Sequence, residues 1–151
     1  MTFQIGYNAD GGNQQWVDAV CNNLHQVLGI TAYGKAYPTF KQFRDEITQR
    51  TIKIAFRSGW AGDYPSVYNF LQPLYMTGAS SNDGNYSSPA FDKLISQAAA
   101  ASSINESKKF YRKAQAILMR DLPASPLWYP NASTASTQQL NRLQLMSSGD
   151  P

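Results

Sequence analysis

Hydrophobic and polar residues alternate at the start of the chain and then change to a helical spacing. The segment from Phe3 to Asn8 alternates, as a half-buried strand does. Beyond it, apolar residues recur every three or four positions, at Trp16, Val17, Val20, Cys21, Leu24, Val27 and Leu28. Asn13 stands where an N-cap is expected, and Gly29 stands where a left-handed C-cap is expected. The pattern therefore predicts a strand, a helix of about 15 residues and a sharp stop.

The same two patterns then repeat. Residues 30–37 predict a second strand, which Pro38 ends, and residues 51–56 predict a third. Between them Thr39 and Gln42 have the spacing of a capping box. The apolar residues of the helix that follows share one face, at Phe40, Phe43 and Ile47. The order β-α-β-α-β predicts an α/β fold with a parallel-centred sheet, right-handed connections and helices on both faces.

The second half of the chain is predicted to be more helical. A short helical segment is expected around residues 67–74, and Ser88 followed by Pro89 has the pattern of a helix start. Ser103 and Glu106 form another capping-box pattern, before a helix that continues to about Asp121. Two further strands are expected in the segments "SPLWYP" and "LNRLQLM", residues 125–130 and 140–146.

Composition narrows the class of protein. The 151 residues suffice for one core, so residues 1–151 are expected to form a single α/β domain. Hydrophobic residues make up 42% and charged residues only 15%, with a polar uncharged surface of the kind common in secreted and cell-envelope proteins. The net charge of +3 comes from scattered Lys and Arg residues, which argues against a nucleic-acid partner. One cysteine and one histidine exclude an internal disulfide and a zinc cluster, and no metal or cofactor is expected.

The N-terminus and the apolar runs bear on targeting. "MTFQIGYNADGG" lacks the charged and apolar regions of a signal peptide and is expected to enter a strand almost at once. No apolar run reaches the roughly 20 residues of a membrane-spanning helix.

The residues that could form a binding site cluster just after the third predicted strand. Within seven residues the sequence places Arg57, Gly59, Trp60, Gly62 and Asp63. In an open parallel sheet, ligands bind beyond the carboxyl ends of the strands. The glycines are expected to allow turns, the tryptophan to form a flat wall, and the two charges to hold the ends of a zwitterion. The same spacing also fits two surface charges and a tryptophan that caps the core.

This stretch also carries a family resemblance. "SGWAGDYPSVYNFL", "NYSSPAFDKLISQA" and "ESKKFYRKAQAILMRDLPASPLWY" resemble, in that order, segments of the extracytoplasmic solute-binding proteins of oligopeptide and dipeptide ABC importers. The upstream segment "FQIGYNADGGNQQWVDAVCNNLHQVLGI" fits the same family, so the resemblance covers nearly the whole chain.

The resemblance implies which part of a larger protein this chain forms and which of its residues bind the ligand. The chain is similar to most of the C-terminal lobe of a two-lobe protein, a periplasmic-binding-protein-like lobe, and is expected to be a fragment of such a protein. Family members close on a peptide or similar small solute and deliver it to membrane permease subunits. The chain is therefore expected to be a monomer and not an enzyme. By this resemblance Asp63 pairs with the ligand's α-amino group and Arg57 with its carboxylate, while Trp60, Ala61, Gly62 and Tyr64 line the cleft.

The resemblance also implies a location outside the cytoplasm, in the periplasm or on a membrane-anchored lipoprotein. One departure is Ser66-Val67, where many relatives carry Asp-Pro or a similar pair, so the ligand's identity stays open.

Other motifs have simpler interpretations. Cys21 and His25 stand four residues apart, as a thiolate–imidazole pair could, but Cys21 falls on the apolar stripe and is expected to be buried and inert. "NADGGN" lacks the remaining residues of a phosphate loop, and "SSNDGN" lacks the calcium-loop pattern. The cations of residues 108–120 form either a solvated helix face or a docking face for a membrane partner. A hydrolase or transferase that uses Asp63 as acid/base, and a stand-alone interaction domain, remain as rival functions.

Overall fold

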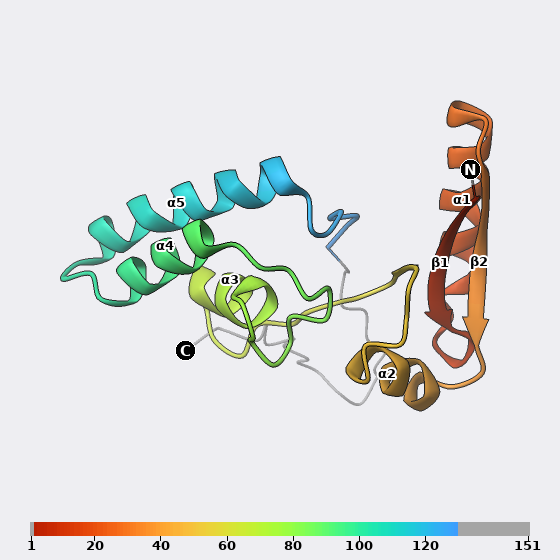
Figure 1. Cartoon of the computed structure of the whole chain (residues 1–151), viewed down its shortest axis with the longest axis horizontal. Coiled ribbons are helices and arrows are strands. Elements are labelled where there is room, and N and C mark those ends of the chain that lie inside the picture. Colours follow the sequence, from red (N-terminus) through yellow and green to blue (C-terminus); the bar gives the residue numbers. More distant parts are fainter. Residues whose placement is uncertain (1, 130–151) are drawn as a thin grey trace, which may run out of the picture. The chain divides into compact units, whose positions relative to one another are not determined.

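The computed structural model of the chain describes residues 2–129. These form two compact units, the first ending at Gly59 and the second beginning at Trp60. The first unit contains a three-stranded sheet and two α-helices, and the second contains three α-helices (Figure 1). No helix among these residues combines the length and the apolar character needed to cross a bilayer. The expectation that residues 1–151 form a single domain stays a prediction.

The sheet of the first unit is parallel and has the order β2-β1-β3. Its strands are β1 (Thr2–Asn8), β2 (Thr31–Tyr37) and β3 (Ala55–Phe56). β1 is central and pairs with β2 along its whole length, from Thr2 opposite Thr31 to Asn8 opposite Tyr37. Because all three strands run in one direction, their carboxyl ends meet at one edge of the sheet. The predicted β-α-β-α-β order and the parallel sheet are confirmed.

The two helices of this unit, α1 (Gln14–Leu28) and α2 (Phe40–Thr48), cover opposite faces of the sheet. On one face Ile5 and Tyr7 pack with Val17 and Cys21 of α1. On the other face the core is formed by Tyr37 of β2 with Phe43 and Ile47 of α2, against which Ile52 and Phe56 pack.

Two glycines allow these layers to approach the sheet closely. A Cβ added at Gly34 would lie 2.8 Å from side-chain atoms of Tyr7 and Val17, on the α1 side. One added at Gly6 would lie 3.3 Å from Tyr37, on the α2 side.

The third strand is shorter than the predicted residues 51–56. Thr51 and Ile52 donate their backbone N–H groups to the carbonyl of Glu46, at distances of 3.0 and 3.3 Å. The Thr51 hydroxyl donates to the same carbonyl. These residues therefore satisfy the carbonyl of Glu46, which is open because it lies in the last turn of α2. Only Ala55 and Phe56 remain to pair with β1.

The helix ends of the first unit mostly follow their sequence signals. Gly29 adopts φ 66° at the C-cap of α1, and the Thr39 hydroxyl accepts from the N–H of Gln42 at the start of α2. Asn13 does precede α1, but its side chain makes no capping bond. It donates to Asn8 and accepts from the Trp16 indole instead, so a contact with β1 takes the place of the predicted cap.

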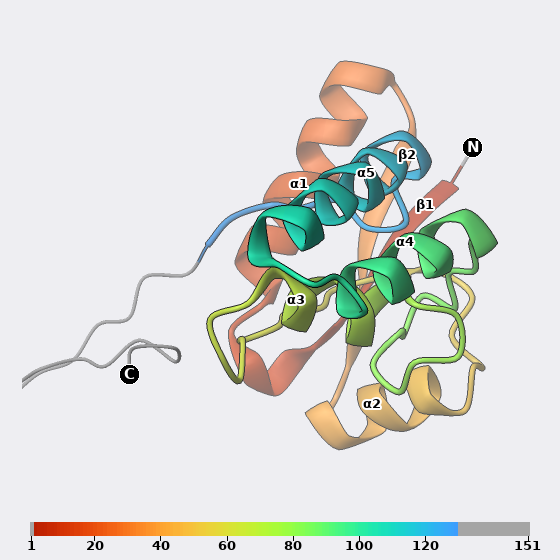
Figure 2. The ribbon, with the colours of Figure 1, turned by 90° about the vertical axis from the view of Figure 1, so that its left-hand side faces the viewer.

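The second unit consists of α3 (Val67–Tyr75), α4 (Pro89–Ala99) and α5 (Ile104–Asp121). α4 and α5 lie side by side (Figure 2). Their apolar stripes meet α3 in one core, built from Leu71, Phe91, Ile95 and Ala114. Ser88 and Ser103 cap α4 and α5 as predicted, by accepting from Phe91 and Glu106. The more helical second half is thus confirmed.

One strand prediction in this half is wrong. Residues 125–129, the described part of "SPLWYP", form no strand. Trp128 and Tyr129 are 55% and 96% exposed, and no strand among residues 2–129 pairs with this segment, so its β-favouring composition is not enough to form a strand. The strand predicted at 140–146 lies outside the described residues.

Candidate functional site

Arg57 stands at the carboxyl edge of the sheet, as its position after the third strand predicts. Its N–H donates to the Gly6 carbonyl at 2.9 Å, which extends the ladder between β1 and β3 by one bond. Its side-chain Nε donates to Oδ1 of Asn8, the last residue of β1, at 3.0 Å. The guanidinium lies over the rings of Phe40 and Phe43, with 5.5 and 5.8 Å to their centroids. Since only Nε is used among the described residues, the terminal nitrogens remain able to donate to a bound carboxylate.

Burial shapes the electrostatics of this edge. It lowers the pKa of the half-buried Arg57, the Arg44 guanidinium adds to the lowering, and Asp10 opposes it. A guanidinium keeps its charge nevertheless, because its pKa starts far above neutrality. Asp10 accepts from the Asn8 amide at 2.7 Å and from the Phe40 N–H at 3.0 Å. These two bonds, with Arg57 acting in the same direction, hold the pKa of Asp10 below its ordinary value of 3.8.

The lowered pKa of Asp10 predicts a pH-dependent contribution to stability. A carboxylate with a depressed folded-state pKa stabilises the fold fully above its unfolded value and loses that effect as pH falls through the folded value. We therefore expect the thermal midpoint of Asp10→Asn to lie below that of the parent chain at pH 6. The two midpoints should converge as pH falls below about 3.8. Thermal unfolding followed by circular dichroism over this range measures the gap. A gap that stays constant, or that widens in acid, would contradict the assigned role.

The Trp60–Tyr64 loop belongs to the second unit, where Asn69 of α3 organises it. Asn69 Oδ1 accepts from the Trp60 indole N–H and from the Asp63 backbone N–H, both at 3.1 Å. Asn69 Nδ2 donates to Asp63 Oδ2 at 3.3 Å. Asp63 is exposed, and Asn69 is 5% exposed, so a buried amide fixes an exposed carboxylate. The expectation that Arg57 and Asp63 share one edge of the sheet stays a prediction.

The expected turn-forming role of the two glycines is wrong. Neither Gly59 nor Gly62 has a positive φ; among the described glycines that conformation occurs at Gly12, Gly29 and Gly78. Gly62 is needed for a different reason, because a Cβ there would lie 2.9 Å from the ring of Phe70. Gly59 has open space around it. The remaining two residues of the predicted cleft wall, Ala61 and Tyr64, are exposed.

Sequence reasoning missed the two asparagines that position the charges. Asn8 is 3% exposed and binds Arg57, while Asn69 is 5% exposed and binds Asp63. For Asn69 the sequence contains a signal: it is a polar residue in an otherwise largely apolar helix, and an amide that such a helix buries requires partners. For Asn8 the partner is 49 positions away in sequence, so no local pattern reveals it.

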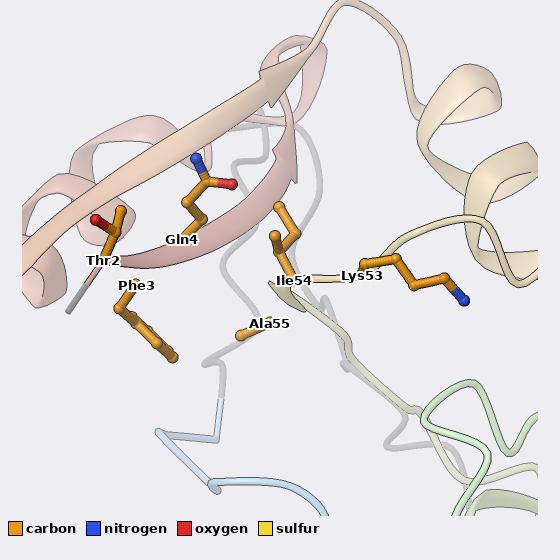
Figure 3. A pocket seen from close by; sticks show the side chains of 6 residues that line it. All are labelled: Thr2, Phe3, Gln4, Lys53, Ile54 and Ala55. Carbon is orange, nitrogen blue, oxygen red and sulfur yellow. The ribbon is translucent and has the colours of Figure 1, made fainter.

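Two other features lie apart from these charges. A hollow of about 400 Å³ opens beside the amino end of β1 and is lined by Thr2, Phe3, Gln4, Lys53, Ile54 and Ala55 (Figure 3). It contains none of the predicted site residues.

Burial raises the pKa of the Cys21 thiol, and the charge of Asp18 adds to this. His25 Nδ1 lies 2.9 Å from the Ile30 carbonyl oxygen, just beyond the C-terminus of α1. The burial of Cys21 and this contact of His25 favour a structural role for both residues.

Comparison with known proteins identifies the relatives of this chain. No family model matches. The periplasmic oligopeptide-binding protein OppA of Salmonella typhimurium is 30% identical over 129 residues, which are 85% of this chain and 23% of that protein. The dipeptide-binding protein of Lactococcus lactis is 30% identical over 80% of this chain and 22% of its own length. The chain therefore spans between 22% and 27% of the length of the five curated relatives it matches most strongly.

The fold agrees with the sequence relationship. The murein tripeptide binding protein MppA of Escherichia coli superposes with a TM-score of 0.74 and 25% identity, over 82% of this chain and 24% of that structure. Haemophilus influenzae OppA, solved in complex with the peptide RPPGFSPFR, has the same fold, with a TM-score of 0.72. The chain is thus a homologue of the oligopeptide- and dipeptide-binding proteins, the solute-binding family that its motifs resemble.

Proposed function

We propose that this chain is the C-terminal lobe of an extracytoplasmic solute-binding protein and supplies half of the binding site for a peptide or similar small solute. The intact protein would release its solute to the membrane permease subunits of an ABC importer. The observation that carries the proposal is the homology to proteins named for oligopeptide and dipeptide binding, over at least 80% of this chain. The periplasm, or the cell surface for a membrane-anchored lipoprotein, is the corresponding location.

Each predicted site residue has a chemical role in this proposal. The exposed carboxylate of Asp63 would accept the ligand's α-ammonium group, since Asn69 occupies only one of its oxygens among the described residues. The terminal nitrogens of Arg57 would hold the ligand's carboxylate. Trp60 would supply an apolar wall, and the backbone from Ala61 to Tyr64 would offer hydrogen bonds that do not depend on the ligand's side chains. Closure of two lobes by a hinge motion would then enclose the solute.

A binding role fits these contacts better than acid/base catalysis. The hydrolase or transferase alternative requires Asp63 in a water-poor pocket, whereas Asp63 is exposed. Among residues 2–129 no three His, Cys, Asp or Glu side chains come close enough to hold a metal ion. We propose, as the resemblance and the composition led us to expect, that the chain binds its solute as a monomer and without catalysis, and that it has no nucleic-acid partner.

Titration of the 151-residue chain with tripeptides, followed by amide NMR, tests the proposal. Half of the enclosing contacts would come from the other lobe, so we expect binding weaker than micromolar. The shifts should fall on Gly59 to Tyr64 and on Arg57, and N-acetylated tripeptides should leave Asp63 unshifted. Micromolar binding by the chain alone would contradict the half-site. Shifts that fall on other residues, or no shifts at high peptide concentration, would contradict the site.

A further inference from the structure

Helix α5 carries a continuous cationic face, defined by Lys108, Lys109, Arg112 and Lys113. All four side chains are exposed. Their spacing forms two pairs four residues apart, which places them on neighbouring parts of one side of the helix. The opposite side of α5 packs against the core of the second unit through Ala114, with Tyr111 and Leu118 partly buried beside it.

Helix α5 carries an excess of positive charge, whereas in the rest of the chain the Lys and Arg residues are scattered and balanced by acids. α5 contains five cations and two acids, so its net charge of +3 equals that of the whole chain. Its two acids are held elsewhere: Glu106 accepts from the N–H and the hydroxyl of Ser102, and Asp121 is bound by Arg120 and Tyr86. Among residues 2–129, none of the four cations of the face forms an ion pair.

The spacing of these four cations does not stabilise helix α5. Like charges four residues apart destabilise a helix, and here two such pairs follow one another. A solvated face that served only solubility would gain from an acid at one position of each pair. The grouping of these four cations without acids between them therefore favours an anionic partner.

The chemistry of the face indicates which kind of partner. Three of its four cations are lysines, which act as flexible point charges and do not form the fixed two-bond contacts of arginine. Exposed apolar side chains lie near its ends: Ile104 is 73% exposed and Met119 is 67% exposed. A basic helix flanked by apolar side chains suits a diffuse anionic surface into whose boundary apolar groups can insert.

We propose that the cationic face of α5 binds the surface of a bilayer that contains anionic phospholipid. The helix would lie along the headgroups with its apolar side still packed in the protein core. This proposal goes beyond the proposed peptide site and does not rest on it, because it uses none of the site residues.

Flotation of the purified 151-residue chain with vesicles tests the proposal. The vesicles contain phosphatidylcholine alone or a mixture with phosphatidylglycerol, at low ionic strength. We expect the chain to bind the mixed vesicles, and salt to weaken this binding. The triple variant Lys108→Gln/Lys109→Gln/Lys113→Gln should bind on the order of 100-fold more weakly, from about fivefold per lysine. The matched control, Lys35→Gln/Lys41→Gln/Lys53→Gln, removes the same charge from the first unit and should bind less than about threefold more weakly.

The outcomes separate the possibilities. Equal losses in the two triple variants would show that net charge alone acts, and would overturn the assignment to α5. Equal binding to both kinds of vesicle, or no binding to either, would overturn the lipid partner. Retention on immobilised poly-L-glutamate without vesicle binding would assign the face to an acidic protein instead. That result would also overturn the lipid partner. Circular dichroism of each variant confirms that its helices remain, so a lost interaction is not mistaken for unfolding.

Discussion

Asp63→Ala is expected to weaken the binding of peptides with a free amino terminus by about 2–4 kcal/mol in the intact two-lobe protein. In the chain alone the Asp63 carboxylate is exposed and is held by Asn69 at 3.3 Å. Closure of the two lobes would remove water from the ammonium–carboxylate pair, and a buried cation that loses its partner is costly. Calorimetric titration of the parent and the variant with the same tripeptide measures the loss.

Two controls separate ligand pairing from damage to the loop. N-acetylated peptides carry no ammonium group, so their affinity should change by less than about 0.5 kcal/mol. The variant Ser66→Ala removes the cap of α3, whose hydroxyl accepts from Tyr68, and disturbs the same loop without touching the carboxylate. It should affect free and acetylated peptides alike. An equal loss for both kinds of peptide in Asp63→Ala would refute the proposed role of this residue.

Phe91→Ala is expected to lower the free energy of unfolding by about 3–5 kcal/mol. Phe91 is fully buried in the core of the second unit, packed with Leu71, Ile95 and Ala114. The rings of Tyr86 and Tyr75 meet it edge-on, with centroids 6.1 and 6.4 Å away. Removal of its ring therefore leaves a cavity and also ends two favourable aromatic contacts. Urea unfolding followed by helical circular dichroism measures the change.

The matched control is an aromatic residue that is not packed in this core. Tyr129 is 96% exposed, so Tyr129→Ala should change the free energy of unfolding by less than about 0.5 kcal/mol. Phe91→Leu keeps most of the volume and should cost less than Phe91→Ala. If Phe91→Ala proved as mild as the Tyr129 variant, the core of the second unit would not be packed as described.

The sequence predicted most of the helices because their signals are local. The hydroxyls of Thr39, Ser88 and Ser103 each accept from the N–H group three residues later in the chain, and Gly29 supplies a left-handed C-cap. These bonds form wherever the helix forms, so residue order is enough to place them. The candidate site could be predicted in part for the same reason: Arg57 follows β3 directly, and the order of the strands places it at the carboxyl edge.

Predictions that depended on a contact with another element fared worse. β3 begins at Ala55 and not at Thr51, and the N–H groups of Thr51 and Ile52 bond to the carbonyl of Glu46 instead of to a strand. Asn13 sits where a cap belongs, yet its side chain bonds to Asn8. Gly62 was interpreted as a turn residue, whereas it is required by the ring of Phe70. In each case the competing contact comes from another element, and a local pattern does not contain it.

The sequence by itself determined the β-α-β-α-β order and the helices of the second half, most of the helix caps, and the placement of an arginine at the exit of the third strand. Only the tertiary structure decided which groups hold the two charges: Asn8 for Arg57 and Asn69 for Asp63. The physical reason is the range of the interactions. Helix stripes and caps act within a few residues of the chain, while a buried amide finds its partner only after packing has brought separate segments together.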